Sequence, residues 1–208
     1  PPNNVVYSPH TYTLTKGTQM IPVTPTAAGG IVEDWSIYPN LPWGLNIDSI
    51  TGEISGTPTF ISASNTYTVY ANNTGGSATV IVTIAVTDVP PLFSYSPSSV
   101  IVETGVNITT LTPTLYGQGT VVSWSVTPNL PPGISLDSST GVISGIPTTP
   151  AGLVSYTITG TNSGGTDTAV IEIEVIAGTN LSINYSIILL KIIKIIKDLL
   201  LMAEILDQ

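Results

Sequence analysis

Residues 128–150 read PNLPPGISLDSSTGVISGIPTTP, and residues 39–60 read PNLPWGLNIDSITGEISGTPTF. The two stretches are copies of one pattern, because a shift of 89 residues along the chain also places Trp35 on Trp124. Self-similarity at a fixed spacing indicates a repeated structural unit. The sequence therefore predicts two copies of one domain, and the chain of 208 residues is long enough to hold them.

The boundaries of the copies follow from proline pairs and from a change in composition. Pro-Pro begins the chain and recurs at residues 90–91, so we expect one domain over 1–89, a second over 90–178, and a linker at about 88–91. The remaining segment, 179–208, contains three of the four lysines and long runs of Ile and Leu, and it does not belong to the repeat.

Within each copy the hydrophobic pattern has a period of two, which is typical of β-strands. In the last strand of copy one, Val82, Ile84 and Val86 alternate with other residues; in copy two, the alternating positions are Ile171, Ile173 and Val175, with Glu172 and Glu174 between them. Threonine, which favours a pleated and half-buried surface, makes up 31 of the 208 residues. We predict an all-β fold of two tandem immunoglobulin-like β-sandwiches.

The motif at residues 128–150, with Trp124 before it and Tyr156 after it, resembles the signature of immunoglobulin-like and dystroglycan-type cadherin-like tandem repeats of large surface proteins. The resemblance covers about residues 4–176. It implies a seven-stranded sandwich used in arrays on cell surfaces, without catalysis. The first copy departs mildly from the motif, with Trp43 where proline is usual and with Glu53 in place of the valine that copy two has.

Composition narrows the functional classes. Thirteen acidic residues stand against four lysines and no arginine, for a formal net charge of −9. Nucleic-acid binding needs clustered positive side chains that neutralise phosphates, so we expect no nucleic-acid partner. The chain has no cysteine, which excludes disulfides, thiolate metal sites and cysteine nucleophiles. The hydrophobic fraction of 42% is high enough for a packed core.

No group of residues has the pattern of a catalytic centre. Asp48 and Asp137 head the repeated turns, where aspartate accepts main-chain hydrogen bonds and glycine supplies a positive φ. Glycosidase-type catalysis would need two carboxyls converging in one cleft, whereas these two belong to separate copies. His10 is the only histidine, and no nucleophile motif surrounds it. We therefore predict that the protein is not an enzyme and has no catalytic residue.

Metal binding has one candidate. Asp88 lies just before the second Pro-Pro pair, a place similar to the calcium-rigidified junctions between cadherin domains. A calcium ion takes six to eight oxygen ligands, and the clustered acidic residues that would supply them are missing around Asp88. We expect no metal and no cofactor.

The aromatic residues divide into two groups. The structural core is predicted to contain Trp35, Trp124, Tyr67 and Tyr156, which occupy matching positions in the two copies. Trp43 lies in a proline-rich loop and has no aromatic counterpart in copy two. Together with Tyr38 it is a candidate for stacking on a sugar ring; the alternative is that Trp43 packs over the end of the sandwich or the junction between domains.

Four asparagines head N-x-S/T sequons, which accept glycans on a glycosylating secretory route. These candidate N-glycosylation sites are Asn72, Asn107, Asn180 and Asn184.

The last segment predicts a strongly apolar, amphipathic α-helix over residues 187–206, which contain no glycine or proline. A spacing of three and four places six residues on one seam: Leu189, Ile192, Ile196, Leu199, Ala203 and Leu206. We favour self-association of this helix into a parallel coiled-coil bundle. A membrane span is the weaker alternative because five charged residues fall within the stretch, and an interfacial membrane helix is a third.

Taken together, these patterns predict a non-enzymatic structural or adhesion module, extracellular or on the cell surface, whose copies are held together by the helix. Its expected partners are other copies of itself and protein or glycan ligands on surfaces. Two alternatives stay open. One is a filament subunit, pilus-like, with the helix in the fibre core; the other is a carbohydrate-binding accessory that uses Trp43 and Tyr38.

Overall fold

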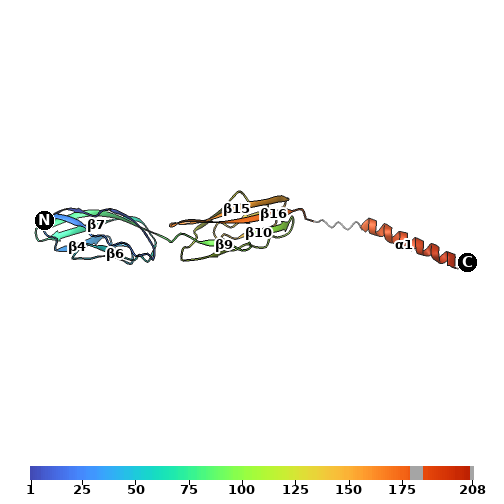
Figure 1. Cartoon of the computed structure of the whole chain (residues 1–208), viewed down its shortest axis with the longest axis horizontal. Helices are drawn as coiled ribbons and strands as arrows, with labels where there is room; N and C mark the ends of the chain where they lie inside the picture. The colour runs from blue at the N-terminus through green and yellow to red at the C-terminus, as the bar shows by residue number, and fades with distance from the viewer. Residues whose placement is uncertain (179–184, 207–208) are drawn as a thin grey trace. The chain divides into compact units, whose positions relative to one another are not determined.

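The computed structural model describes residues 1–178 and 185–206, which form two compact units, Pro1–Ile176 and Ala177–Gln208 (Figure 1). The first unit holds two β-sandwiches that follow one another along the chain, and the second holds one helix. The fold class predicted from the repeat and from the apolar tail is confirmed.

Each sandwich contains eight strands. Those of the first are β1 Pro2–Val6, β2 Thr11–Thr15, β3 Thr26–Gly29, β4 Asp34–Tyr38, β5 Leu45–Ile47, β6 Ile54–Gly56, β7 Ser62–Asn73 and β8 Gly76–Thr87. Those of the second are β9 Phe93–Tyr95, β10 Ser99–Glu103, β11 Pro113–Leu115, β12 Ser123–Thr127, β13 Ile134–Leu136, β14 Ile143–Gly145, β15 Ala151–Asn162 and β16 Gly165–Ile176.

The resemblance implied seven strands, and the difference lies at the start of each repeat. The first strand is divided at a cis peptide bond before Pro9 or Pro97, so that its two halves join different sheets. In the first repeat β1 pairs with β3, whereas β2 pairs with β8. The second repeat makes the same division between β9 and β10.

One layer of each sandwich is a four-stranded sheet. Its order is β2-β8-β7-β4 in the first repeat and β10-β16-β15-β12 in the second. All neighbours in this sheet are antiparallel except the edge pair, in which β2 runs parallel to β8 and β10 runs parallel to β16. The short pairs β1-β3 and β5-β6, with their counterparts β9-β11 and β13-β14, form the other layer.

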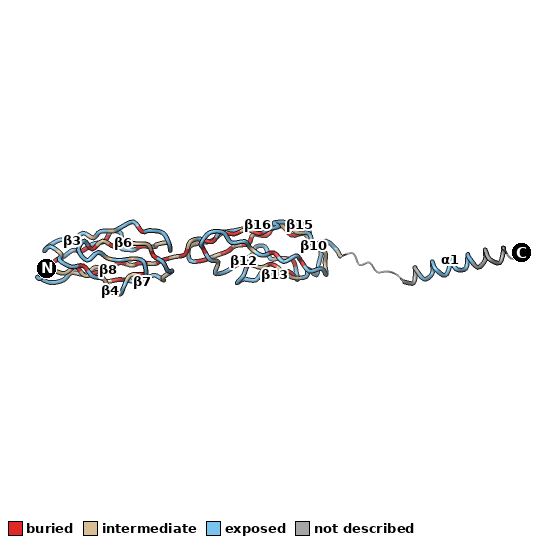
Figure 2. Tube along the Cα trace, turned by 90° about the horizontal axis from the view of Figure 1, so that it is seen from below, coloured by how far each residue is buried: buried red, intermediate tan, exposed pale blue. Residues whose placement is uncertain are grey.

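The core lies between the layers, where Figure 2 shows the buried stretches of each sandwich. Along β8 the alternation read from the sequence holds, since Val82, Ile84 and Val86 are at most 1% exposed and the residues between them are partly exposed. The aromatic residues assigned to the core are also buried: Trp35, Trp124, Tyr67 and Tyr156. Alternate burial of β-branched side chains is what fixes the register of these strands.

The repeats differ by one residue near their start. Four residues separate Pro2 from Tyr7, but three separate Pro91 from Tyr95. The extra residue makes a β-bulge in β1, where Asn4 takes a φ of +46° and the pairing with β3 shifts. Corresponding residues are therefore 88 apart at β2 and β10, and 89 apart again from Trp35 onward.

The helix α1 spans Tyr185–Leu206, beginning two residues before the predicted start. Within the described ranges 1–178 and 185–206, no helix has both the length and the low charge of a membrane-spanning segment.

Candidate functional site

The aspartate carboxylates of the repeated turns accept hydrogen bonds from main-chain groups of the same turn. Asp48 accepts hydrogen bonds from the N–H groups of Thr51 and Ile50, each at 2.8 Å. Asp137 accepts the equivalent bonds from Thr140 and Ser139. These main-chain donors favour the ionised form and lower the pKa of both carboxyls below the ordinary value. The two aspartates therefore cap turns in separate sandwiches, as the sequence predicts.

The glycine that ends each turn supports the buried tryptophan. Gly141 has a φ of +74°, and a Cβ atom there would lie 2.7 Å from the ring of Trp124. Its carbonyl accepts a hydrogen bond of 2.5 Å from the Tyr95 hydroxyl. Gly52 repeats this arrangement under Trp35 in the first sandwich. Turn, tryptophan and tyrosine thus form one structural unit in each repeat, which leaves these residues in a packing role.

The junction between the repeats is held by a network that the sequence analysis did not identify. Asn162 donates hydrogen bonds to the carbonyl oxygens of Val89, at 2.6 Å, and Thr120, at 2.7 Å. Its own side-chain oxygen accepts bonds from the N–H groups of Gly164 and Gly165. One asparagine therefore ties the linker to two loops of the second sandwich.

Asp88 completes this network, which we call the junction clamp (Asp88, Val89, Thr120, Asn162 and Ser163). The Asp88 carboxylate accepts a 2.7 Å bond from the Thr120 hydroxyl and a 3.0 Å bond from the Val89 N–H. The Thr120 hydroxyl, followed by main-chain donors, holds the pKa of this carboxyl below its ordinary value although burial opposes the shift. The Asp88 N–H in turn donates to the Ser163 hydroxyl.

The clamp uses the carboxylate that was considered for calcium. Both oxygens of Asp88 already accept protein hydrogen bonds. Among the described residues, no three potential metal-binding side chains of the His, Cys, Asp or Glu type come together. His10 lies exposed beside Pro9, and its carbonyl accepts a hydrogen bond from the Thr83 N–H.

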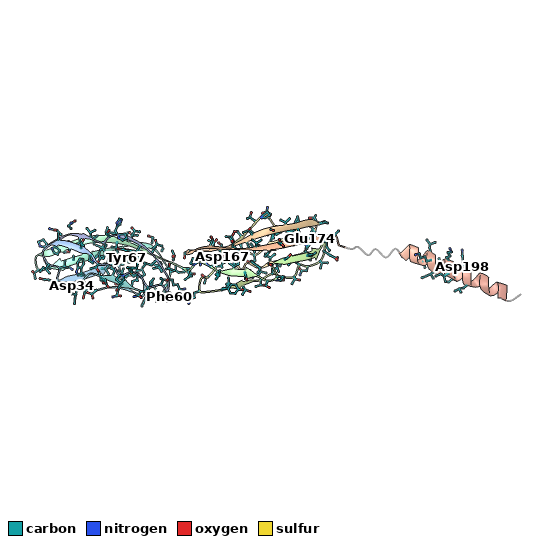
Figure 3. All side chains as sticks on the ribbon, in the orientation of Figure 1. Asp34, Phe60, Tyr67, Asp167, Glu174 and Asp198 are labelled. Carbon is teal, nitrogen blue, oxygen red and sulfur yellow. The ribbon has the colours of Figure 1, made fainter. Side chains whose placement is uncertain are left out.

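Three aromatic side chains of the first sandwich are exposed to solvent. Tyr38 is 72%, Trp43 78% and Phe60 65% exposed. Strand β4 runs from Asp34 to Tyr38, and Figure 3 shows Asp34 and Phe60 toward opposite ends of the sandwich. We call Tyr38, Trp43 and Phe60 the aromatic end.

The loops that carry Trp43 and Phe60 are joined, because the Trp43 carbonyl accepts a 2.9 Å bond from the Thr59 N–H. Trp43 does not pack over the sandwich or the junction, as one alternative had it, since most of its surface faces solvent. The sequence analysis did not identify Phe60 as a candidate binding residue. It could have done so, because Phe60, like Trp43, has no aromatic counterpart in the second repeat.

The second sandwich has no aromatic end. The residues at the corresponding positions are Thr127, Pro132 and Thr149. The backbone is the same, since the Pro132 carbonyl accepts a hydrogen bond from the Thr148 N–H as Trp43 does from Thr59. The second repeat therefore offers a direct comparison for any binding by these aromatic side chains.

The remaining candidates lie on the surface or outside the described residues. Asn107 is exposed and Asn72 is partly exposed, whereas Asn180 and Asn184 lie outside the described residues. Four residues of the helix seam, Leu189, Ile192, Ile196 and Leu199, are 47% to 60% exposed. The side chains of Ala203 and Leu206 lie outside the described set.

Comparison with known families agrees with this architecture. The family model described as "Putative Ig domain" matches residues 2–87 and again residues 90–176. Two proteins of Staphylococcus aureus named "Serine-rich adhesin for platelets" are similar in sequence. The protein of strain MSSA476 is 32% identical over 162 residues, which cover 75% of this chain and 7% of that protein. The protein of strain MRSA252 is 34% identical over 133 residues, which cover 62% of this chain and 9% of that protein. The chain thus spans a small part of the relatives it matches.

Among solved structures, the N-terminal eight immunoglobulin domains of Down Syndrome Cell Adhesion Molecule, isoform 1.30.30, superimpose with a TM-score of 0.50 at 17% identity. The match covers 85% of this chain and 26% of that one. At this level of identity the likeness concerns the fold alone.

Proposed function

Because the chain belongs to the "Putative Ig domain" family over both of its repeats, we propose that it is a non-enzymatic adhesion and display module of an extracellular or surface protein. Its sequence relatives are named as adhesins, and its solved structural neighbours are immunoglobulin domains. In this role the sandwiches space and present a binding surface instead of enclosing a substrate.

The observation that carries the proposal is the junction clamp. A flexible linker would let each repeat move alone, but Asn162 and Asp88 bind the linker residues to the second sandwich through their side chains. Buried polar groups of this kind are costly to leave unpaired, so the bonds resist opening. Clamped repeats suit a stalk that must hold a ligand-binding surface at a distance.

We also propose that the helix gathers several such stalks. About half of the surface of each of Ile192, Ile196 and Leu199 is exposed to water. Burial of these side chains against another copy of the helix would be favourable, because it removes apolar surface from water. Clustered stalks would then bind through many weak contacts, which multiply in effective strength. Membrane attachment and a fibre core are the other uses of the same apolar face.

Light scattering on a size-exclusion column tests the helix. For the double variant Ile192→Glu with Ile196→Glu we expect loss of the defined oligomer that the full chain forms through the helix. The control is Lys191→Gln with Lys194→Gln, which changes the net charge by the same amount on the opposite face. One mass in all three samples, whether that of a monomer or of an oligomer, would contradict self-association through the seam. Electron microscopy of the oligomer tests for filaments.

Binding to a cell surface tests the adhesive role. Platelets are the first surface to use, because the relatives are named for them. We expect the fluorescent full chain to bind platelets, and the seam variant to bind at least about tenfold more weakly because it has lost the multivalency that the helix supplies. Binding no stronger than that of an unrelated protein of equal net charge would count against adhesion to this surface.

Carbohydrate recognition is a second candidate, supported by the exposure of Trp43 and Tyr38. Exposed aromatic rings stack on the apolar faces of sugars, and the acidic body favours neutral over anionic glycans. A glycan array would test it with Trp43→Pro and Tyr38→Thr, each of which introduces the residue of the second repeat. Unchanged glycan binding in both variants would refute the assignment of these rings.

A further inference from the structure

A groove runs along the open edge of the first four-stranded sheet. It has a volume of about 670 Å³ and lies between strand β2 and the segment 18–24. Its apolar lining includes Tyr12, Leu14 and Met20, and the exposed Ile21 lies at its rim. Strand β2 is the last strand of its sheet, so one side of its backbone faces this groove.

The hydrogen bonds show which main-chain groups point into the groove. The Thr83 N–H donates to the His10 carbonyl, and the Lys16 N–H donates to the Thr87 carbonyl. Because neighbouring residues of a strand direct their main-chain groups to opposite sides, even-numbered residues of β2 face β8. Thr11, Thr13 and Thr15 therefore direct theirs outward, and in the described part of the chain only the Thr15 carbonyl has a partner there, the Thr18 N–H.

The threonines of β2 are placed symmetrically about Thr13. The strand reads TYTLT, so in an antiparallel pair of two copies Thr13 would meet Thr13, Thr11 would meet Thr15, and Tyr12 would meet Leu14. Threonine pairs and aromatic–aliphatic pairs across strands are stabilising. Each pair of outward residues exchanges two main-chain bonds, for about six in all, of which the two to the Thr15 carbonyls share that acceptor with the Thr18 N–H.

The distribution of charge favours pairing of two copies through the β2 edge over pairing through the β10 edge of the second repeat. The sheet face beside β2 carries Thr15, Thr83 and Ala85. At the same places the second repeat carries three carboxylates, Glu103, Glu172 and Glu174, the last of which is labelled in Figure 3.

Pairing two copies through β10 would join six carboxylates on one sheet face, which repel one another. The groove beside β10 is also smaller, at about 400 Å³, and the sequon residue Asn107 lines it. In a protein with a net charge of −9, the uncharged β2 edge is where a second acidic copy can approach.

From this combination we infer that β2 of the first repeat is a self-pairing edge, whose partner is β2 of a second copy in antiparallel register about Thr13. The inference goes beyond the proposed function, since it requires neither a host ligand nor the helix. It provides a main-chain contact between two copies whose β2 strands run in opposite directions, which distinguishes it from the parallel packing proposed for the helix.

Disulfide capture tests the register directly, because the chain has no cysteine of its own. In the proposed pair the two Thr13 Cα atoms lie about 5.5 Å apart, within the range that a disulfide bridges. We expect the full chain with Thr13→Cys to form cross-linked dimers at least about tenfold faster than the same chain with Ile101→Cys, the equivalent position of β10. Helix association alone would favour cross-linking at Ile101, because the second repeat is next to the helix along the chain, and so cannot make Thr13→Cys the faster variant.

A second pair of variants tests the main-chain bonds. Thr13→Pro removes an outward N–H without touching the bonds to β8, and Ile101→Pro does the same in β10. By sedimentation velocity we expect Thr13→Pro to weaken association of the full chain at least about tenfold, and Ile101→Pro to leave it unchanged. Three outcomes would overturn the inference: equal cross-linking at Thr13 and Ile101, no cross-linking at either, or faster cross-linking at Ile101. The groove would then be a binding site for an unrelated extended chain.

Discussion

Replacing Asn162 with alanine should destabilise the second repeat far more than the equivalent change in the first. The Asn162 side chain makes four hydrogen bonds, between 2.6 and 3.1 Å, and the residue is 9% exposed. At a net contribution of about 0.5 to 1.5 kcal/mol for each bond, Asn162→Ala should cost about 2 to 6 kcal/mol. The deletion also leaves the carbonyls of Val89 and Thr120 without this donor.

Asn73 is the control, because it holds the equivalent turn of the first repeat with fewer bonds. Its side chain donates to the Ile31 carbonyl and accepts from the Gly75 N–H. These bonds are exposed, so Asn73→Ala should cost about 1 kcal/mol. Urea unfolding followed by circular dichroism gives both values, and amide exchange of Asp88 and Val89 shows whether the linker has been released. An equal cost in the two variants, or an unchanged exchange rate at the linker, would refute the junction clamp.

Other residues give further tests. Trp124→Ala should cost about 3 to 5 kcal/mol, because it empties the centre of the second core, and an unchanged melting temperature would disprove that role. Tyr95→Phe should cost about 1 kcal/mol by removing the bond to the Gly141 carbonyl. Burial raises the pKa of Tyr95, so its stabilisation is complete below pH of about 10 and falls as the pH rises further; the phenylalanine variant should lack this alkaline loss. Asp88→Asn should cost about 1.5 to 3 kcal/mol at neutral pH by weakening the bonds to Thr120. The lowered pKa of Asp88 means that its stabilisation is present above pH of about 4 and is lost as the pH falls through the folded-state value, so stability curves that stay parallel in acid would contradict its role.

The fold could be predicted from the sequence because the residues that determine it lie close together in the chain and recur in both repeats. A tryptophan, a turn and an alternating strand recur at one spacing, and each has a direct structural meaning: Trp124 is buried, Asp137 caps the turn, and Ile171 and Ile173 face the core. The helix was also predicted, from an uninterrupted apolar stretch with a helical period.

The candidate sites were harder to predict from the sequence, because they depend on contacts between distant residues or on differences between the two copies. Asn162 lies in an ordinary Asn-Ser-Gly-Gly turn, and nothing in that turn shows that it reaches Val89, which is 73 positions away. Phe60 is distinctive only because the second repeat has threonine there. The bulge at Asn4 changes the spacing by one residue near the start, where the motif gives no reference point.

The parallel pairing of the first edge strand with the last strand determines how each repeat carries mechanical load. The chain enters β2 and leaves β8 at opposite ends of two strands that run the same way, and β10 and β16 repeat this geometry. Tension along the chain therefore slides the paired strands past each other and loads their hydrogen bonds together, whereas a hairpin pulled at its open end would unzip one bond at a time. Each repeat should therefore extend in a single step at high force.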